Sequence, residues 1–284
     1  MPPSAETAPT VTPAAAAQLP ATGRPRGRGR LRRLLVPCAS IVGGLALWQL
    51  AITVLRPNEL AVVGPDRVVR DAIDLFDAGT LGPDIGLSLA QLLIGLAIAV
   101  VAGVLTGLLL GTSRLLGEAL GPWVTALYTI PVIAVAPLVI VGLGFGFTAK
   151  ITIVAASAFF PLVINTQAGA AGTVGGGLRD VTRAFHANAL ETLVCLTLPG
   201  TVPHILTGLR LAIGRALIAL VAADLFGSTS GLGYLIISGQ QNLKTDDVYV
   251  GVVTLSVIGI AMTALVATAE RRVHHARGAR TEQA

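Results

Sequence analysis

Residues 85–113 read IGLSLAQLLIGLAIAVVAGVLTGLLLGTS, and none of these 29 side chains carries a charge. As an α-helix they would extend about 43 Å, more than the roughly 30 Å of a bilayer's hydrocarbon core. A polar backbone crosses that core only when its hydrogen bonds are satisfied internally, as they are in a helix. The stretch therefore predicts a membrane-spanning helix.

Other parts of the chain repeat this pattern. Four more charge-free runs of at least 22 residues cover 34–55, 119–149, 151–178 and 248–269. A sixth apolar segment, about 205–227, carries Arg210, Arg215 and Asp224. The sequence thus predicts an all-α membrane protein with six transmembrane helices.

The composition excludes other classes. Only 12% of the residues are charged, 53% are hydrophobic and the mean hydropathy is +0.77, whereas soluble domains carry about 25% charged residues. A water-soluble domain is therefore excluded, and two cysteines are too few for a disulfide scaffold.

The lysines and arginines predict an orientation. If the N-terminus is cytoplasmic, thirteen of the 20 lie in cytoplasmic segments and five in external ones. Cytoplasmic loops are enriched in Lys and Arg, so both termini are expected in the cytoplasm. The basic charge then reflects topology and contact with anionic lipid, so nucleic acid is not an expected partner.

The segments outside the spans also have patterns. Residues 1–33 predict a disordered basic cytoplasmic tail, the segment 34–55 a first transmembrane helix, and 271–284 a second basic tail. The segment 56–84 is an expected extracellular loop, in which Pro65 begins a short amphipathic helix. The apolar residues of that helix are Val68, Val69, Ala72, Ile73 and Phe76.

Two features inside the spans concern packing. Small residues recur every four positions in the second span: Gly95, Ala99, Gly103, Gly107 and Gly111. Such a row lets another helix approach closely. The third span contains Pro131 and Pro137 and is expected to kink, either for packing alone or because it lines a pathway.

The cytoplasmic stretch 169–204 predicts two short helices joined by a turn. Leu178, Val181 and Phe185 share one helical face, and Asn188 with Glu191 forms an expected capping box. The second helix is expected to end before Pro199. Such a hairpin either docks a soluble partner or lies on the membrane surface without one.

At this point the sequence resembles a known family. The chain reads DVTRAFHAN from Asp180, TLP at 197–199, GTVP at 200–203, ILTGLRLAIGRAL from Ile205, DLFG from Asp224 and GLGYLI from Gly231. This pattern resembles the cytoplasmic EAA signature, and the sequence after it, of ABC importer permeases of the nitrate/sulfonate/taurine type. The resemblance extends back through Ile130-Pro131, Pro137-Leu138 and Phe159-Phe160-Pro161, and it covers about 65–270.

The resemblance implies a type I ABC importer permease fold, with 85–270 as the permease domain in a prokaryotic plasma (inner) membrane. It implies an assembly of two permease copies as a homodimer, two ATP-binding ABC ATPase subunits and an extracellular or periplasmic substrate-binding protein. It assigns ATPase coupling to the segment 178–198 between the fourth and fifth helices. The candidate coupling residues are Leu178, Asp180, Val181, Thr182, Arg183, Phe185, His186, Ala187, Asn188 and Glu191.

The chain departs from the family pattern at three points. Asp180-Val181-Thr182 stands where Glu-Ala-Ala is usual, and Asp224 stands where Glu is usual. His186 occupies the motif's glycine, a position that permits a left-handed turn. The turn is therefore expected to differ slightly, and the ATPase partner to be matched to it.

No catalytic activity is predicted for the chain itself. It has no Gly-x-x-x-x-Gly-Lys-Ser/Thr loop for ATP phosphates and no metal-ligand spacing, so neither a cofactor nor a metal is expected. All four histidines lie in predicted loops or tails, which leaves no Ser–His pair within the membrane. The alternatives are a secondary transporter or channel without an ATPase, and a membrane scaffold. A secondary transporter usually buries carboxylates at mid-membrane, but Asp224 is the only carboxylate in a predicted span and lies near its outer end.

Arg215 is the ionisable residue predicted near mid-membrane. Asp224 lies nine residues on and therefore on the opposite helical face. Arg215 either contacts an anionic substrate transiently or bonds to carbonyls of another helix. The pathway candidates are Pro131, Pro137, Arg215 and Asp224. Sulfonate, taurine, nitrate and nitrogenous vitamin precursors all stay open as solutes, because the binding protein selects the solute in such an assembly.

Overall fold

The computed structural model describes residues 28–55, 62–175, 187–226 and 228–281, and every element in them is helical. The chain divides into two units, Met1–Trp48 and Gln49–Ala284. The described part of the first unit is the beginning of helix α1 (Arg28–Leu55).

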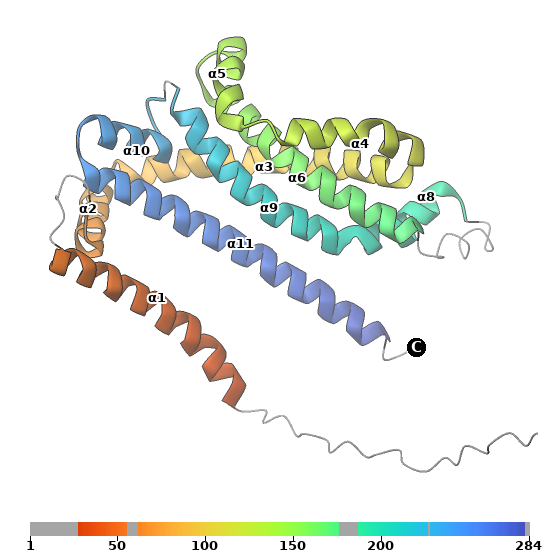
Figure 1. Ribbon diagram of the computed structural model, residues 1–284, viewed down its shortest axis with the longest axis horizontal. Helices are drawn as coiled ribbons and strands as arrows, with labels where there is room; N and C mark the ends of the chain where they lie inside the picture. The colour runs from red at the N-terminus through yellow and green to blue at the C-terminus, as the bar shows by residue number, and fades with distance from the viewer. Residues whose placement is uncertain (1–27, 56–61, 176–186, 227, 282–284) are drawn as a thin grey trace, which may run out of the picture. The chain divides into compact units, whose positions relative to one another are not determined.

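The second unit contains the end of α1 and all the later helices (Figure 1). These are α2 (Pro65–Asp77), α3 (Leu81–Thr112), α4 (Arg114–Tyr128), α5 (Val132–Leu143), α6 (Phe147–Gly175), α8 (Ala189–Thr192), the π-helix η1 (Leu193–Thr197), α9 (Leu198–Asp224), α10 (Leu232–Gln241) and α11 (Thr245–Thr281).

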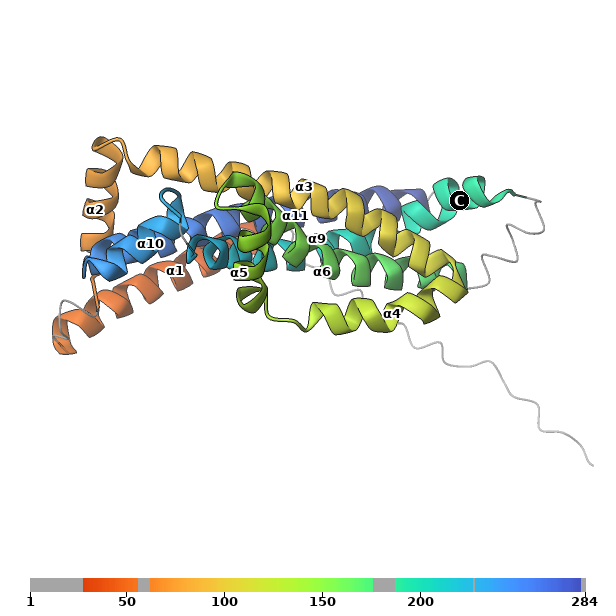
Figure 2. The same cartoon turned by 90° about the horizontal axis from the view of Figure 1, so that it is seen from above.

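The core of this unit lies where α6 packs along both α3 and α9 (Figures 1 and 2). The side chains in these contacts are mostly apolar, and many of them are small. Those that are fully buried include Ala158, Leu162 and Val163 of α6 and Ala212, Ala216 and Leu220 of α9.

The row of small residues in α3, which the sequence predicts to lie against another helix, faces α6. A Cβ added at Gly103 would lie 2.8 Å from Cβ of Leu162, and one at Gly107 would lie 2.6 Å from Cβ of Thr166. Both distances are shorter than any ordinary carbon–carbon contact. Glycine at these positions therefore sets how closely the two helices approach, which confirms the predicted packing role.

The described residues contain fewer candidate spans than the six predicted. Within the described residues, four helices are long and apolar enough to cross a membrane: Leu81–Thr112, Phe147–Thr173, Ala189–Asp224 and Thr245–Arg272. Helices α4 and α5 add a fifth only if the bent pair counts as one span, and Ala39–Leu55 of α1 is apolar but shorter. The protein is thus an all-helical membrane protein with four to five candidate spans.

The third predicted span, 119–149, is broken rather than merely kinked. Helix α4 ends at Tyr128, α5 starts at Val132, and the two are bent by 94° (Figure 2). Pro131 lies at this break in an extended conformation, with ψ of 121°. Proline lacks an N–H and disfavours helix in the residue before it, so the chain turns here, whereas α5 continues through Pro137.

The turn between α9 and α10 is tied to α3. The amide of Gly231 donates to Asp84 Oδ1 at 2.7 Å, and the amide of Leu232 donates to Ser88 Oγ at 2.8 Å. Gly231 has φ of 103°, which glycine adopts easily. These bonds fix the start of α10, a helix that the sequence patterns do not predict.

The predicted amphipathic helix is present as α2. The structure corrects the predictions for the two basic tails. Because α1 begins at Arg28, the tail predicted as disordered over 1–33 is helical over its last six residues. Arg and Leu are good helix formers and extend the apolar helix toward the N-terminus. Residues 1–27 lie outside the described part. At the other end α11 continues to Thr281, into the predicted tail.

The helix predicted to end before Pro199 does not end there. Helix α8 passes through the π-helical turn η1 directly into α9, and Pro199 lies in the first turn of α9. Because the helix is continuous, Pro199 donates no N–H to the preceding turn, and the wider π-helical turn η1 lies where that bond would be. His204, predicted in a loop, consequently lies inside α9, where its ring contacts Gly169.

Candidate functional site

The predicted coupling segment is only partly described. Leu178, Asp180, Val181, Thr182, Arg183, Phe185 and His186 lie outside the described residues. The capping box that follows them is confirmed, because Asn188 Oδ1 accepts from the amide of Glu191 at 2.8 Å and Glu191 Oε2 accepts from the amide of Asn188 at 2.9 Å.

An apolar strip follows the capping box. Leu190, Val194 and Leu198 are spaced four residues apart and are 69%, 53% and 36% exposed. An exposed row of large apolar side chains at a helix end is suited to contact another protein or a membrane surface.

A buried ion pair joins α6 to α9. Lys150 Nζ lies 2.5 Å from Asp224 Oδ1 and donates a hydrogen bond to Ser228 Oγ at 2.6 Å. The Asp224 side chain is 0% exposed and that of Lys150 is 11% exposed. Lys150 is one of the five lysines and arginines predicted in external segments, and its pairing with Asp224 is not predicted from the sequence. The sequence feature that could have indicated the pair is the opposite charge of Lys150 and Asp224, each at the end of an apolar segment.

Arg215 lies near the middle of α9, about 13 Å along the helix axis from Asp224. Its guanidinium carbon is 4.5 Å from the centroid of the Tyr128 ring, at the end of α4. Ser157 of α6 donates a hydrogen bond to the Arg215 carbonyl at 3.3 Å. Within the described part of the chain, no carboxylate and no carbonyl of another helix pairs with the Arg215 side chain.

This arginine lines a cavity of about 220 Å³ at the broken helix. The wall comprises Leu127, Tyr128, Ile130, Val132, Val135, Ala156, Ser157, Phe160 and Arg215. Residues on both sides of the α4–α5 break contribute to it, so the break opens the cavity. Of the four pathway candidates only Arg215 lines the cavity. Pro131 forms the break beside it, Pro137 lies inside α5, and Asp224 belongs to the buried ion pair.

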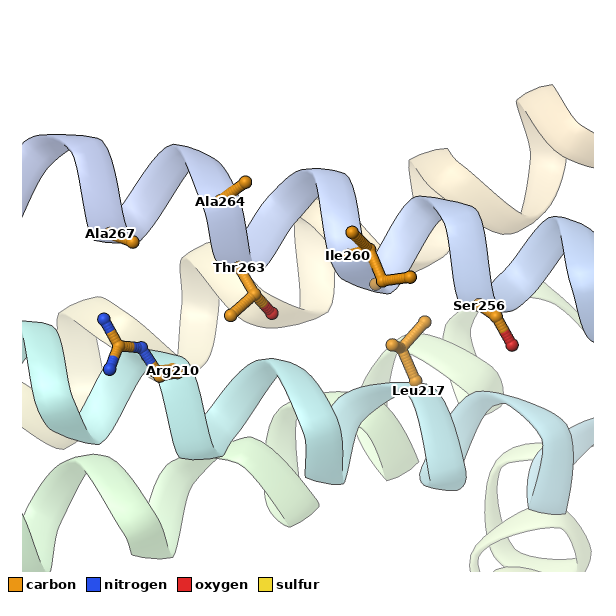
Figure 3. A pocket seen from close by; sticks show the side chains of 8 residues that line it. Arg210, Leu217, Ser256, Ile260, Thr263, Ala264 and Ala267 are labelled. Atoms are coloured by element: carbon orange, nitrogen blue, oxygen red, sulfur yellow. The ribbon is translucent and has the colours of Figure 1, made fainter. Parts of the chain in front are cut away.

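Arg210 has a different environment one and a half turns away on α9. It pairs with Glu270 of α11 at 2.5 Å, at one end of an open groove of about 670 Å³ between these helices (Figure 3). Apolar and small side chains line the remainder of the groove, among them Leu217, Ile260 and Ala264. The charge of Arg210 is therefore already balanced within the chain, whereas that of Arg215 is not balanced by any described residue.

The chain matches curated permeases over most of its length. It is 32% identical to the putative aliphatic sulfonates transport permease protein SsuC of Bacillus subtilis, over 86% of this chain and 87% of that one. It is 30% identical to the nitrate import permease protein NrtB of Leptolyngbya laminosa, over 86% and 88%. It is 27% identical to the taurine transport system permease protein TauC of Escherichia coli, over 85% and 90%.

The fold is also found in a solved transporter. The chain aligns with an inward-facing structure of the MetNI methionine ABC transporter at a TM-score of 0.57 and 16% identity, over 67% of this chain and 94% of that chain. This likeness concerns the fold alone.

The family model for binding-protein-dependent transport system inner membrane components matches residues 99–275. This match decides against a secondary transporter or a channel without an ATPase. The chain therefore belongs to the binding-protein-dependent transport system inner membrane components, the multi-pass permeases of ABC importers in which the ATPase is a separate subunit.

Proposed function

We propose that this permease works as a homodimer and imports a small anionic or zwitterionic solute of the sulfonate, taurine or nitrate type. A substrate-binding protein delivers the solute on the outer side, and two ATPase subunits drive alternating access from the cytoplasm. The observation that carries the proposal is the similarity to the sulfonate, nitrate and taurine permeases over about 85% of the chain. The charge of Arg215, which no described carboxylate balances, lies in a cavity at the α4–α5 break and supports an anionic solute.

Six transmembrane helices with both termini in the cytoplasm complete the proposed architecture. Helix α1 is the first span, and the bent pair of α4 and α5 crosses as one. The distribution of lysine and arginine, thirteen inside against five outside, supports this orientation. Broken helices are tolerated at membrane depth where they line a cavity, which the α4–α5 break does.

Residues 178–198 are the proposed ATPase-docking segment. Its support is the confirmed capping box at Asn188 and Glu191, together with the exposed apolar strip of Leu190, Val194 and Leu198. A few side chains that become buried when two proteins bind usually carry most of the binding energy, so truncating them causes most of the loss of affinity.

The test is to purify the tagged full-length chain from its native membrane and identify the proteins that co-purify. We expect a P-loop ATPase in a one-to-one ratio. The double variant Leu190→Ser/Val194→Ser should lose most of the ATPase while inserting normally, and solute uptake should fall in parallel. The matched control is Leu115→Ser, which changes a 77% exposed leucine in α4. Undiminished ATPase recovery from the double variant would refute the docking assignment.

A further inference from the structure

None of the described residues that line the cavity beside Arg215 carries the negative charge that would balance this arginine. A charged side chain within a membrane span is costly and is normally paired or placed in a wet cavity. Arg210 meets this condition through Glu270, but no described carboxylate lies against Arg215. An anionic solute passing through the cavity would supply the missing charge. This inference rests on the proposed function, because it places the cavity on the solute's route.

The orientation of Arg215 restricts the chemistry of that anion. The guanidinium carbon lies over the Tyr128 ring, 4.5 Å from the ring centroid, which is a cation–π contact. The N–H donors of a guanidinium lie along the edges of its plane, so an edge that does not face the ring is available to an anion. That edge matches a head group with two neighbouring oxygens, which it binds through two parallel hydrogen bonds. Sulfonate, carboxylate and nitrate all satisfy this condition.

The remaining wall selects among these anions. Apart from Arg215, the polar side chains that line the cavity are the hydroxyls of Tyr128 and Ser157, and the others are apolar. The volume of 220 Å³ would hold about seven waters at roughly 30 Å³ each. A head group therefore leaves room for a chain of a few carbons against Ile130, Val135 and Phe160.

The apolar wall strengthens the binding of a solute with an apolar chain and weakens the binding of a solute with an ammonium group. Each CH₂ that leaves water for an apolar surface strengthens binding about fourfold. An ammonium group would lose its hydration with no described carboxylate in the cavity to replace it. Nitrate fits the arginine but leaves the apolar wall uncovered.

We propose that the cavity between Arg215, Tyr128 and the α4–α5 break binds organic anions that combine an oxyanion head with a short apolar body. Arg215 binds the head, Tyr128 holds the guanidinium in position, and the apolar wall takes the body. The site disfavours aminosulfonates and inorganic oxyanions.

The test is direct binding to the purified full-length permease in nanodiscs of phosphatidylcholine, without a binding protein, so that only the permease selects. The probes are butanesulfonate, taurine and nitrate, and affinity is measured by isothermal titration. Butanesulfonate should bind at least tenfold more tightly than either of the others. Equal affinity for the three probes, or no binding of butanesulfonate, would overturn the proposal.

Variants assign the selectivity to the named residues. Arg215→Gln should abolish butanesulfonate binding, and Arg215→Lys should weaken it about tenfold because the paired hydrogen bonds are lost. Tyr128→Phe keeps the stacked ring and should stay within twofold, whereas Tyr128→Leu should weaken binding a few-fold. Arg210→Lys is the control and should bind normally. Unchanged binding in Arg215→Gln would place the anion elsewhere.

The outcome is distinguishable from failure of the proposed function. ATPase co-purification tests the importer assembly and does not depend on this cavity. Selective butanesulfonate binding without an ATPase partner would keep the site and reject the importer. An ATPase partner together with equal binding of all three probes would support the importer and reject the proposed site.

Discussion

At the scale of single residues, the charges near the membrane have distinct environments. Lys150 and Asp224 neutralise each other in a buried site, Arg210 pairs with Glu270, and the Arg215 guanidinium lies over the Tyr128 ring. A buried pair contributes little net stability, but removing one partner leaves an uncompensated charge. The environment of each charge therefore decides what a substitution does.

Asp224→Asn should strongly destabilise the protein because Lys150 then stays buried without its counter-ion. We expect a loss of about 3–5 kcal/mol, the usual cost of breaking a buried pair. The double variant Lys150→Met/Asp224→Asn should recover most of the loss. Thermal unfolding of the purified variants measures both effects. As a control, Arg70→Gln affects an exposed pair with Asp66 and should cost less than about 1 kcal/mol. If Asp224→Asn unfolded like the parent protein, the pair would have no structural role.

Asp71 of α2 should make stability depend on pH. Burial raises the pKa of its carboxyl, as do the negative charges of Asp246, Asp247 and Asp74, while Arg67 opposes the shift. A carboxyl with a raised pKa in the folded state favours folding when protonated, so its contribution is lost as the pH rises through that pKa. Asp71→Asn should therefore raise the unfolding temperature at pH 7 and change it little at pH 4. If Asp71→Asn changed the unfolding temperature by the same amount at both pH values, this assignment would be contradicted.

At the scale of elements, the packing of α3 on α6 depends on glycines. At Gly107 an added Cβ would lie 2.6 Å from Cβ of Thr166 and 2.8 Å from the backbone oxygen of Val163. At Gly86, in the same helix, an added Cβ would meet no atom within 4 Å. Replacing each of these two glycines by alanine therefore distinguishes the effect of helix packing on stability from the effect of helix propensity.

Gly107→Ala should destabilise the protein by roughly 1–3 kcal/mol because α3 and α6 must separate. Gly86→Ala should be neutral or slightly stabilising, since alanine is the better helix former. Thermal unfolding of the two variants side by side is the measurement. Equal stabilities would show that the contact between α3 and α6 relaxes without cost.

At the scale of the whole molecule, the proposed topology places Ala189 and Gln240 on opposite sides of the membrane. Ala189 starts α8, which continues into α9, and Gln240 lies in α10 after that span ends. A reporter fused after Gln240 should be extracellular, and reporters fused after Ala189 and Ala284 should be cytoplasmic. Accessibility of each fusion to an impermeant label is the measurement. Labelling of Ala189 and Gln240 from the same side would reject the six-helix arrangement.

The sequence by itself determined the class of the protein, most of its helices and its family. Charge-free runs such as 85–113 indicate membrane-spanning helices because an apolar helix of this length matches the hydrocarbon core of a bilayer. The glycine row and the capping box at Asn188 were also predictable, since both depend on residues a few positions apart. Local spacing is enough for features of this kind.

Only the tertiary structure decided which distant residues meet. Lys150 and Asp224 are 74 positions apart, and Tyr128 lies 87 positions before Arg215. The sequence indicates a kink near Pro131, but the 94° bend there and the π-helical turn before α9 are known only from the structure. Periodicity identifies a helix and its apolar face, but it does not specify the neighbouring helix or its register. The cavity and the placement of Arg215 in its wall are therefore products of the assembled bundle.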